Sequence, residues 1–396
     1  MLMAPVALGA LVAFAAAVSV TRLTRALAVR HGHVDVPDAR KRHARAVPHL
    51  GGVGIAAGVA AGLVAVAASG GVGLAGVLPL LVGAAVITGL GLWDDVRGVG
   101  FKRRFAVQTA VAYGMVLAGW HVDVSNLPVL GALGPFEQAA VALPITLLWT
   151  VGLCNAMNLI DGLDGLAGGV AVVAFGALGV AYAGDAGLVA LCAVAIAATA
   201  GFLVFNVHPA SIFMGDTGST LLGFLLAMAG LRGVDGAPTL GLLAVPVVAL
   251  GLPVLDTLTT MARRVSRRQS PFLPDADHIH HRVLERSHSV HGAVRALWGA
   301  GAVFGAIAVV LSRADGSNAV QALCVLASVA FGYLVVRRLR YVRARVLWRR
   351  LQRRQIHRRR ALATVAVAPA LVAQTGGDGS GGAGLLDPPT VADAEA

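Results

Sequence analysis

The chain has 396 residues, of which 57% are hydrophobic and only 13% are charged. A soluble domain of ordinary composition has about 45–50% apolar and about 25% charged residues. This chain cannot cover a globular surface with charge, so the composition excludes a soluble protein and predicts an all-α polytopic integral membrane protein. The formal net charge is nevertheless +12, and so few charges with so strong a bias must be interpreted by their position.

Taken in chain order, eleven apolar segments are candidates for membrane-spanning helices. A spanning helix needs about 20 predominantly apolar residues. Several of these segments are rich in Ala and Gly, which suits close packing of helices in lipid. The predicted spans are 4–21, 50–69, 74–93, 105–120, 139–155, 165–184, 187–205, 217–231, 239–261, 294–312 and 318–336.

The basic residues predict the orientation of these spans. Thirty of the 32 Lys and Arg residues fall in alternate loops, in the C-terminal tail or at Arg295, and only Arg232 and Arg313 fall on the other side. Cytoplasmic loops of membrane proteins carry the excess of Lys and Arg. We therefore expect the N-terminus outside and the C-terminus in the cytoplasm. The predicted cytoplasmic loops are 22–49, 94–104, 156–164, 206–216 and 262–293.

Beyond the predicted membrane domain, residues 1–336, the tail divides into two segments. Residues 337–360 carry twelve Arg among Leu, Val and Trp residues. This pattern favours a plain juxtamembrane anchor, and a helix lying on anionic lipid headgroups is the alternative. Residues 361–396 include a Gly-rich and then acidic stretch, which predicts disorder. Topology thus explains the basic charge, which indicates membrane lipids and no nucleic acid as its partner.

Asp94 and Asp95 stand at the cytoplasmic end of the third predicted span. Two adjacent carboxylates repel each other unless a cation neutralises them, and unpaired acids at the end of an apolar helix are costly. The pair indicates a site for a divalent metal or for phosphate transfer. A hydrated pair of loop residues near Arg97 and Lys102 is the alternative.

The segment NAMNLIDGLDGLAGG, residues 155–169, is more specific. Asn158, Asp161 and Asp164 are spaced three residues apart, so they share a face if the segment is helical. Glycine-mediated helix packing explains the glycines. It does not explain two acids and two amides beside a membrane span.

A third segment, NVHPASIFMGDTGST at residues 206–220, places Asp216 between glycines just before the eighth span. Mg²⁺ prefers carboxylate, carbonyl and water oxygens and commonly binds phosphates as well. Asp216 is therefore a candidate metal ligand. An ordinary helix N-cap at Asp216, Thr217 or Ser219 is the alternative, and both can hold because they use different atoms.

Cations and histidines accompany these acids. His278, His280, His281 and Arg282 follow a stretch broken by prolines. Zinc binding by the three histidines lacks an obvious Cys or carboxylate partner, so contact with phosphate fits better. A charged loop enriched by chance is the alternative for each residue. Lys41 lies in another loop suited to phosphate, although a topological charge cluster alone explains it.

Together these segments place carboxylates, amides and cations on one predicted membrane face. Carboxylates that hold Mg²⁺ and cations that hold phosphate are the usual needs of phosphoryl transfer. The sequence has no GxxxxGK[ST] loop, which argues against an ATP-driven P-loop protein. Secondary transport of an anionic solute is the competing class, but its acids would lie near the midplane of the bilayer.

The motifs Asp94-Asp95, NAMNLIDGLDGLAGG, NVHPASIFMGDTGS, PVLDT and HIHHR occur in this order. They resemble the bacterial polyprenyl-phosphate N-acetylhexosamine-1-phosphate transferase family over about residues 30–290. The resemblance implies that a polyprenyl phosphate, undecaprenyl or decaprenyl, attacks the β-phosphorus of a UDP-sugar with Mg²⁺ or Mn²⁺ and releases UMP. It also implies a multi-pass protein of the bacterial plasma membrane with a cytoplasmic active site, and a homodimer is compatible with it.

The resemblance implies roles for single residues, transferred position by position. Asp216 matches a metal ligand with Asp94 and Asp95 close by, and Asp94 is the candidate for deprotonating the lipid phosphate. The expected catalytic residues are Asp94, Asp95, Asp161 and Asp216. The other expected contacts are Asn158, Asp164 and Asn206 for the nucleotide, Arg104 and Lys41 for the lipid phosphate, and His278, His280, His281 and Arg282 for the diphosphate or sugar.

Two motifs favour GlcNAc-1-phosphate over phospho-MurNAc-pentapeptide as the transferred group. Ile160 stands where the phospho-MurNAc-pentapeptide translocases usually have Thr, and HIHHR replaces their different histidine loop. The chain also departs from its own family, because His49 and Ala276 stand where Arg is common. The loss of two cations near a phosphate site leaves another UDP-N-acetylhexosamine open as the substrate.

Overall fold

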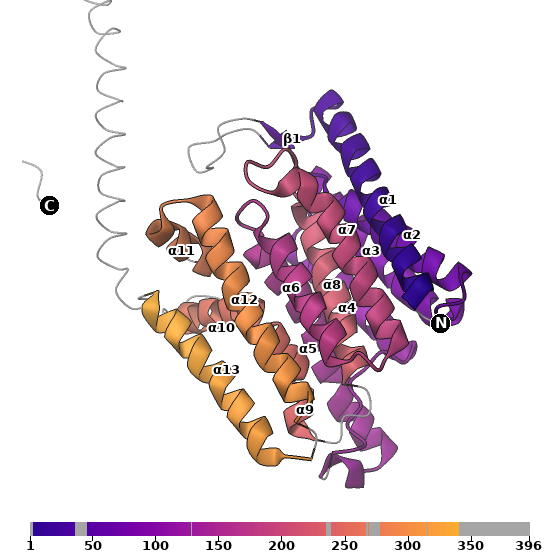
Figure 1. The fold of residues 1–396 in the computed structure, drawn as a ribbon, viewed down its shortest axis with the longest axis vertical. Helices are drawn as coiled ribbons and strands as arrows, with labels where there is room; N and C mark the ends of the chain where they lie inside the picture. The colour runs from indigo at the N-terminus through magenta and orange to yellow at the C-terminus, as the bar shows by residue number, and fades with distance from the viewer. Residues whose placement is uncertain are drawn as a thin grey trace, which may run out of the picture. The chain divides into compact units, whose positions relative to one another are not determined.

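A computed structural model describes residues 3–35, 46–127, 129–234, 239–266, 268, 278–314 and 316–339, and these residues are almost entirely helical (Figure 1). Within them, two short strands, β1 (Val34–Asp35) and β2 (Val47–Pro48), pair antiparallel. The helices are α1 (Met3–Arg30), α2 (Gly52–Ala68), α3 (Leu74–Arg97), α4 (Phe101–Leu117), the 3₁₀ turn η1 (Leu130–Ala132), α5 (Pro135–Ile160), α6 (Leu166–Ala181), α7 (Ala186–Asn206), α8 (Gly215–Gly233), α9 (Leu240–Ala249), α10 (Gly251–Ser266), α11 (Ile279–Ser287), α12 (Val290–Ser312) and α13 (Asn318–Arg338).

The helices confirm an all-α polytopic membrane protein. In the described part of the chain, six helices are long and apolar enough to cross a bilayer, and the bent pair of α9 and α10 would make a seventh. The six are α1, α3, α5, α7, α12 and α13. Each of the eleven predicted segments falls on a helix or on the bent pair. The count of eleven spans and the orientation stay predictions.

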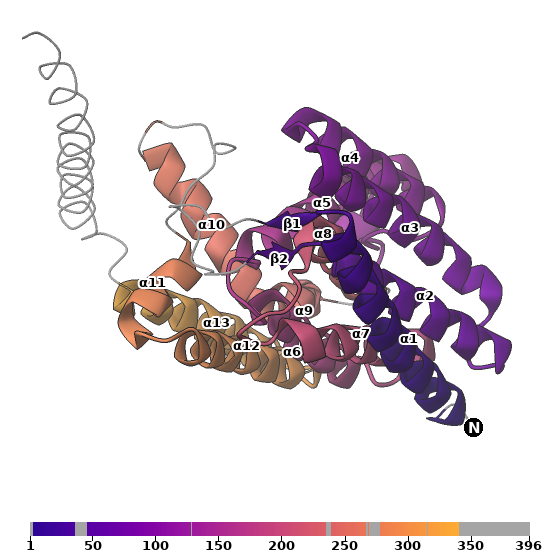
Figure 2. The ribbon, with the colours of Figure 1, turned by 90° about the horizontal axis from the view of Figure 1, so that it is seen from above.

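The ninth predicted span, 239–261, is not one straight helix. The chain turns by 85° between α9 and α10, and in Figure 2 α10 runs outward from the bundle. Proline explains the position of the break. Pro253 has no N–H with which to donate to the carbonyl of residue 249, so the helical hydrogen-bond ladder cannot continue through this point.

The core of the bundle is α8. Every residue from Thr217 to Leu231 is buried, and α8 packs against α3 and α5 and also contacts α2, α6 and α7. A helix that is apolar or small on all sides is expected to lie inside a bundle. Trp149 of α5 donates from Nε1 to the Ala227 carbonyl of α8 at 3.1 Å. The helix that carries Asp216 is therefore held by packing on several sides.

Candidate active site

Asp94 and Asp216 converge on one cation, Arg104. Asp94 lies in the last turn of α3, and Asp216 lies in the first turn of α8. Nη1 of Arg104, near the start of α4, donates to Oδ2 of both carboxylates. The backbone N–H of Val99 also donates to Asp94. Two acids that are far apart in the sequence therefore point at a single positive charge.

Asp95 holds the start of α8. Its carboxylate accepts hydrogen bonds from the backbone N–H groups of Asp216 (2.8 Å) and Thr217 (3.0 Å) and from the Thr217 hydroxyl (2.6 Å). The first N–H groups of a helix lack partners within the helix, and the helix dipole favours a negative charge there. Met214, at the N-cap position, makes no side-chain cap hydrogen bond. The cap of α8 is therefore supplied by α3.

Gly215 makes this close approach possible. Its φ is +71°, a conformation that costs glycine nothing and other residues much more. A Cβ at this position would lie 2.3 Å from the His49 carbonyl oxygen and 2.4 Å from Oδ2 of Asp95. His49 itself donates from Nε2 to the Asp95 carbonyl at 3.1 Å. The His that stands in place of the family's usual Arg therefore ties the loop before α2 to the end of α3.

Backbone hydrogen bonds fix the same loop to the segment that leads into α8. Phe213 donates its N–H to the Pro48 carbonyl at 2.7 Å, and Gly51 donates back to the Phe213 carbonyl at 2.9 Å. Gly52, the first residue of α2, donates to the Met214 carbonyl at 2.9 Å. The sequence motifs around His49 and Asp216 are thus brought together by main-chain contacts.

Asn158 joins α5 to this centre. Its Nδ2 donates to Oδ1 of Asp216 at 2.7 Å and to Oγ of Ser219 at 3.1 Å. An amide that donates to a carboxylate favours the charged form of that carboxylate. Asn158 therefore orients Asp216 through Oδ1, whereas Arg104 contacts Oδ2 of the same carboxylate.

Asp161 adds negative charge beside the same centre. It follows the last residue of α5, and burial, together with the charges of Asp216, Asp95 and Asp164, raises its pKa to about 7. Both causes disfavour the ionised carboxylate. A cation that joined the cluster would reverse this effect, so the carboxylates around Asp161 favour the binding of positive charge.

Asp164 and Asn206 connect the loops around the centre. Asp164 lies 2.6 Å from Nδ1 of His208 and accepts from the Ala210 N–H at 3.0 Å. Asn206 is buried; it accepts from the Gly165 N–H and donates to the Ile212 carbonyl, both at 2.9 Å. The Asn206 amide thus bonds to backbone groups on both sides and holds the two loops together.

The start of α11 is held by Asp256, an acid with no role predicted from the sequence. Its Oδ1 accepts from the Ile279 N–H at 2.8 Å, and its Oδ2 lies 3.1 Å from Nδ1 of His278. Asp256 lies in α10 and is almost fully buried. An acid inside an apolar predicted span is by itself a signal of a functional or structural partner, and by this signal Asp256 could have been found.

His280 lies against the loop of Asp161. A Cβ added to Gly162 would be 2.1 Å from Nε2 of His280, so the two segments are in contact although they are far apart in the sequence. The rings of His278 and His280 are parallel with centroids 5.7 Å apart, and His281 is 4.2 Å from His280. The predicted diphosphate contacts are thus beside the predicted nucleotide segment.

Arg282 contacts the end of α13, and two other residues of interest lie outside the described part. Arg282 is buried, and its Nη1 donates to the Leu339 carbonyl at the end of α13 at 3.4 Å. The described residues do not include Lys41 or Ala276. They also end at residue 339, so most of the Arg-rich segment and all of residues 361–396 lie outside them.

The donors fit a small metal site. Among the residues that the structure describes, no group of three or more His, Cys, Asp or Glu side chains is placed to hold a metal ion by itself. Mg²⁺ usually keeps water and binds one or two carboxylates together with substrate phosphates. Asp94 and Asp216, which converge on one cation, supply the two carboxylates that such a site needs.

Comparisons with known proteins show the family of this chain. Residues 77–234 match the profile of glycosyl transferase family 4. A probable undecaprenyl-phosphate N-acetylglucosaminyl 1-phosphate transferase of Bacillus subtilis is 38% identical over 74% of this chain and 82% of its own length. A decaprenyl-phosphate N-acetylglucosaminephosphotransferase of Mycolicibacterium smegmatis is 32% identical over 69% of this chain and 74% of its own. The undecaprenyl-phosphate alpha-N-acetylglucosaminyl 1-phosphate transferase of Yersinia pestis is 30% identical over 84% and 92%. This chain therefore belongs to the family of polyprenyl-phosphate N-acetylglucosamine-1-phosphate transferases.

Proposed function

We propose that this protein transfers GlcNAc-1-phosphate from UDP-GlcNAc to a polyprenyl phosphate. An oxygen of the lipid phosphate forms a bond to the β-phosphorus of the UDP-sugar, the bond from that phosphorus to the UMP oxygen breaks, and UMP leaves. The product is polyprenyl-diphosphate-GlcNAc. The names of the relatives support this reaction. The structural observation that carries it is the convergence of Asp94 and Asp216 on the guanidinium of Arg104.

Asp94 and Asp216 would hold Mg²⁺ or Mn²⁺, with Asn158 orienting Asp216. A divalent ion bound there would supply charge neutralisation for the diphosphate and the departing UMP. Asp95 takes a different role in this proposal. Because its oxygens accept hydrogen bonds from α8, it positions the helix that carries Asp216.

Arg104 is suited to the lipid phosphate. It bonds to Asp94 and Asp216 through Nη1, while its Nε–H is buried and has no hydrogen-bond partner. A buried donor without a partner is costly, and a phosphate oxygen would satisfy it. The second pKa of a phosphate monoester is about 6, so little deprotonation is needed from Asp94. We favour direct attack by the lipid phosphate, because a covalent phospho-aspartate would require one of these hydrogen-bonded acids as the nucleophile.

The nucleotide and sugar would lie between α5 and α11. Asn158 and Asp164 are the proposed uridine contacts, and His278, His280 and His281 the proposed diphosphate or sugar contacts. The contact of His280 with Gly162 supports one continuous site. The types of side chain support it as well, because carboxylates gather near the start of α8 and imidazoles gather at the start of α11.

The site would face the cytoplasm of a bacterial plasma membrane. The distribution of Lys and Arg supports this orientation with eleven spans. The acids also lie where α3 and α5 end and α8 begins. Such a location suits a reaction between a lipid and a water-soluble nucleotide better than transport through the midplane of the bilayer.

An assay with purified full-length protein tests the proposal. UDP-[¹⁴C]GlcNAc, polyprenyl phosphate and Mg²⁺ should give radioactivity in the lipid fraction and an equal amount of UMP. A panel of other UDP-N-acetylhexosamines and UDP-MurNAc-pentapeptide should give less product. No lipid-linked product with any of these donors would overturn the proposed reaction. Greater transfer from another donor would replace GlcNAc and leave the chemistry intact.

A further inference from the structure

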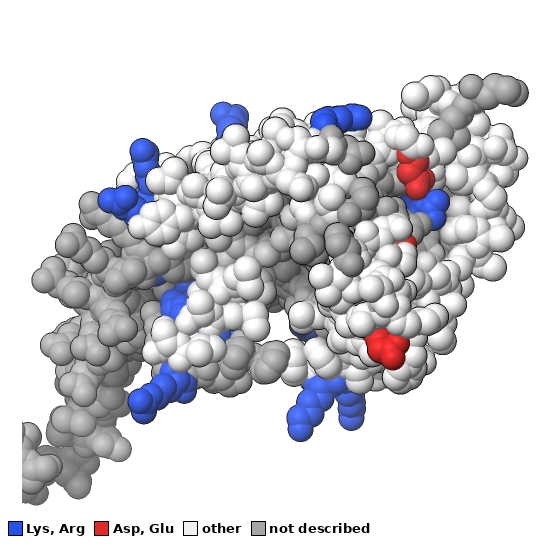
Figure 3. Space-filling view, turned by 90° about the horizontal axis from the view of Figure 1, so that it is seen from below, with Lys and Arg blue, Asp and Glu red and all other residues white. Residues whose placement is uncertain are grey.

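Several carboxylates of the described part engage both of their oxygens within the protein. They are Asp94, Asp95, Asp185, Asp216 and Asp256. Charged residues are scarce, at 13% of the chain, and uncharged residues cover most of the face that Figure 3 shows. In such a protein a carboxylate without partners is costly, so the use of each oxygen is informative.

Asp164 differs from these acids, because both of its hydrogen bonds fall on one oxygen. Nδ1 of His208 lies 2.6 Å from Oδ2, and the Ala210 N–H donates to the same atom at 3.0 Å. A carboxylate has about two lone-pair sites on each oxygen, so these two donors fill Oδ2 and leave Oδ1 for a further donor. The Asp164 side chain is 21% exposed, so a ligand can reach it.

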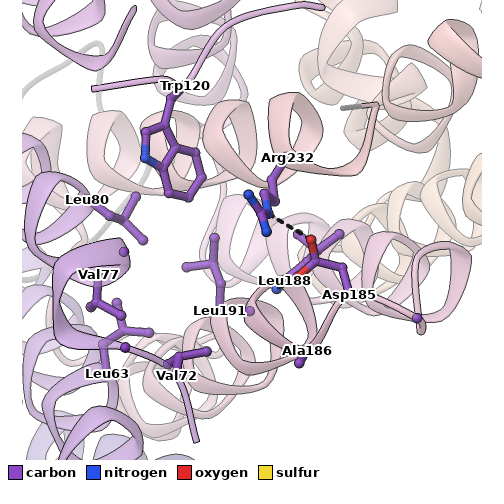
Figure 4. A pocket seen from close by; sticks show the side chains of 14 residues that line it. Leu63, Val72, Val77, Leu80, Trp120, Asp185, Ala186, Leu188, Leu191 and Arg232 are labelled. Carbon is purple, nitrogen blue, oxygen red and sulfur yellow. Dashed lines mark hydrogen bonds and ion pairs between the residues drawn. The ribbon is translucent and has the colours of Figure 1, made fainter. Parts of the chain in front are cut away.

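Asp185, at the other end of α7, shows the purely structural use of a carboxylate (Figure 4). Its Oδ1 accepts from the Leu188 N–H at 3.0 Å and caps α7, while its Oδ2 lies 2.7 Å from Nε of Arg232. Figure 4 shows this pair at the edge of a cavity lined largely by apolar side chains. Each oxygen of Asp185 thus has a donor within the protein. Asp164 makes the same kind of acid–cation contact but keeps Oδ1 available.

The ring of His208 is held from a second side. His291, in the first turn of α12, contacts it edge to face, with centroids 5.2 Å apart and ring planes at 77°, an arrangement that aromatic rings favour. The His208 side chain is 37% exposed, and an acid–cation pair that is open to solvent contributes little to stability. The contacts of His208 therefore serve to orient the Asp164 carboxylate.

We propose that His208 is a positioning residue that makes the nucleotide site selective for uracil. His208 holds Oδ2 of Asp164 so that Oδ1 accepts from the N3–H of the base. The pairing edge of uracil carries one donor, N3–H, between two carbonyl acceptors, whereas an ionised carboxylate only accepts. This inference rests on the proposed function, which assigns Asp164 to the uridine.

The base edge can be tested with UMP and N3-methyl-UMP, in which a methyl group replaces the N3 hydrogen. Binding of each to full-length protein in detergent would be measured by isothermal titration calorimetry. We expect wild type to bind UMP at least about tenfold more tightly, because the methylated base cannot donate to Oδ1. Equal affinity of wild type for the two nucleotides would overturn the proposal.

His208→Ala tests the positioning role. The variant should bind UMP about tenfold more weakly and N3-methyl-UMP nearly as wild type does, so that the discrimination between the two nucleotides is lost. In the transfer assay, KM for UDP-GlcNAc should rise about tenfold while kcat changes little. An equal loss of affinity for both nucleotides would mean that His208 only holds the loop in place, and it would refute the proposal.

Two conservative variants sharpen this test. The side-chain N–H of Asn is as many bonds from Cα as Nδ1 of His, whereas that of Gln matches Nε2. His208→Asn should therefore restore most of the discrimination, and His208→Gln should not. Discrimination that is equal in these two variants would contradict a role of the Nδ1–H bond to Asp164.

Arg232→Gln is the matched control, because it removes the cation from the acid–cation pair at the other end of α7. It should leave the discrimination between UMP and N3-methyl-UMP unchanged, and a loss equal to that of His208→Ala would refute the specific role of His208. The transfer assay separates this inference from the proposed function. Wild type that forms lipid-linked GlcNAc, together with undiminished discrimination in His208→Ala, would refute the inference alone. Wild type that forms no lipid-linked product would refute the proposed function.

Discussion

Two helices of this protein begin at a carboxylate supplied by another helix. Asp95 of α3 accepts hydrogen bonds at the start of α8, and Asp256 of α10 does so at the start of α11. The surroundings differ in charge. Around the start of α8 stand Asp94, Asp216 and Asp161, whereas α11 begins with three histidines and an arginine. The same device thus fixes the acidic residues at the start of α8 and the histidine cluster at the start of α11.

The difference between these two helix starts suggests a division of labour. The acidic start of α8 is suited to a divalent cation, and the start of α11, with its histidines and arginine, to a diphosphate. His280 lies against Gly162, in the loop of Asp161. Substitutions at the start of α8 should therefore abolish the chemical step and lower kcat. Substitutions at the start of α11 should weaken the binding of the UDP-sugar and lower kcat less.

The largest expected effect comes from Asp216→Asn. Asn keeps the size of the side chain but loses the charge that meets Arg104. We expect kcat to fall on the order of 10³-fold, measured by transfer of [¹⁴C]GlcNAc to polyprenyl phosphate. The thermal unfolding midpoint serves as the control for folding. A variant that kept more than a tenth of the activity would mean that α8 does not carry the reaction centre.

Removal of the cap of α8 should have the next largest effect. Asp95→Ala leaves three donors at Asp216 and Thr217 without their acceptor. We expect a loss of about 2 kcal/mol of stability and about 100-fold of activity. Thr217→Val, which removes only the hydroxyl donor, should cost about 1 kcal/mol. Full activity in Asp95→Ala together with a lowered unfolding midpoint would show that the cap stabilises α8 without affecting catalysis. That result would contradict the proposed link between the start of α8 and the reaction.

Removal of the cap of α11 should act on substrate binding. Asp256→Ala frees the Ile279 N–H and His278, so we expect KM for UDP-GlcNAc to rise about tenfold while kcat changes little. Asp256→Asn should restore most of the affinity, because its carbonyl oxygen can still accept from Ile279. A fall in kcat comparable to that of Asp216→Asn, with KM unchanged, would contradict the division of labour.

The smallest expected effect lies at the contact between the two regions. A methyl group at residue 162 would lie 2.1 Å from Nε2 of His280, well inside van der Waals contact, so the buried imidazole must shift. Gly162→Ala should raise KM for UDP-GlcNAc about threefold, equivalent to ~0.7 kcal/mol. Gly152→Ala is the matched control, because a Cβ at Gly152 meets nothing within 4 Å. Equal KM values for the two variants would show that the contact carries no binding energy.

The sequence predicted most of the acidic centre and less of its architecture. Asp94, Asp216 and Asn158 were identified from unusual polar residues beside apolar segments, and the structure brings them together. The hydrogen bonds of Asp95 to the start of α8 depend on how α3 packs on α8, so the sequence indicated a catalytic residue near the metal at this position and no helix cap. Asp256 was assigned no role because its partner, Ile279, lies 23 residues away in another helix, a separation that local sequence patterns do not bridge.

The composition alone indicated a polytopic membrane protein, but the shape of every single helix could not be predicted from the sequence. The segment 239–261 reads as one apolar span, yet Pro253 breaks it into α9 and α10. Hydropathy measures how apolar a segment is and gives no information on whether the helix is straight or bent. Asn206 shows the same limit at the level of a side chain, because its backbone partners Gly165 and Ile212 are set by tertiary packing.

Binding of Mn²⁺, followed by electron paramagnetic resonance, tests the central claim most directly. Free Mn²⁺ would be titrated with purified protein in the presence of UMP, using wild type, Asp216→Asn and Asp256→Asn. We expect one ion to bind to wild type and to Asp256→Asn with similar affinity, and the affinity of Asp216→Asn to be at least about tenfold weaker. Equal binding by all three proteins would contradict the assignment of the metal to the start of α8.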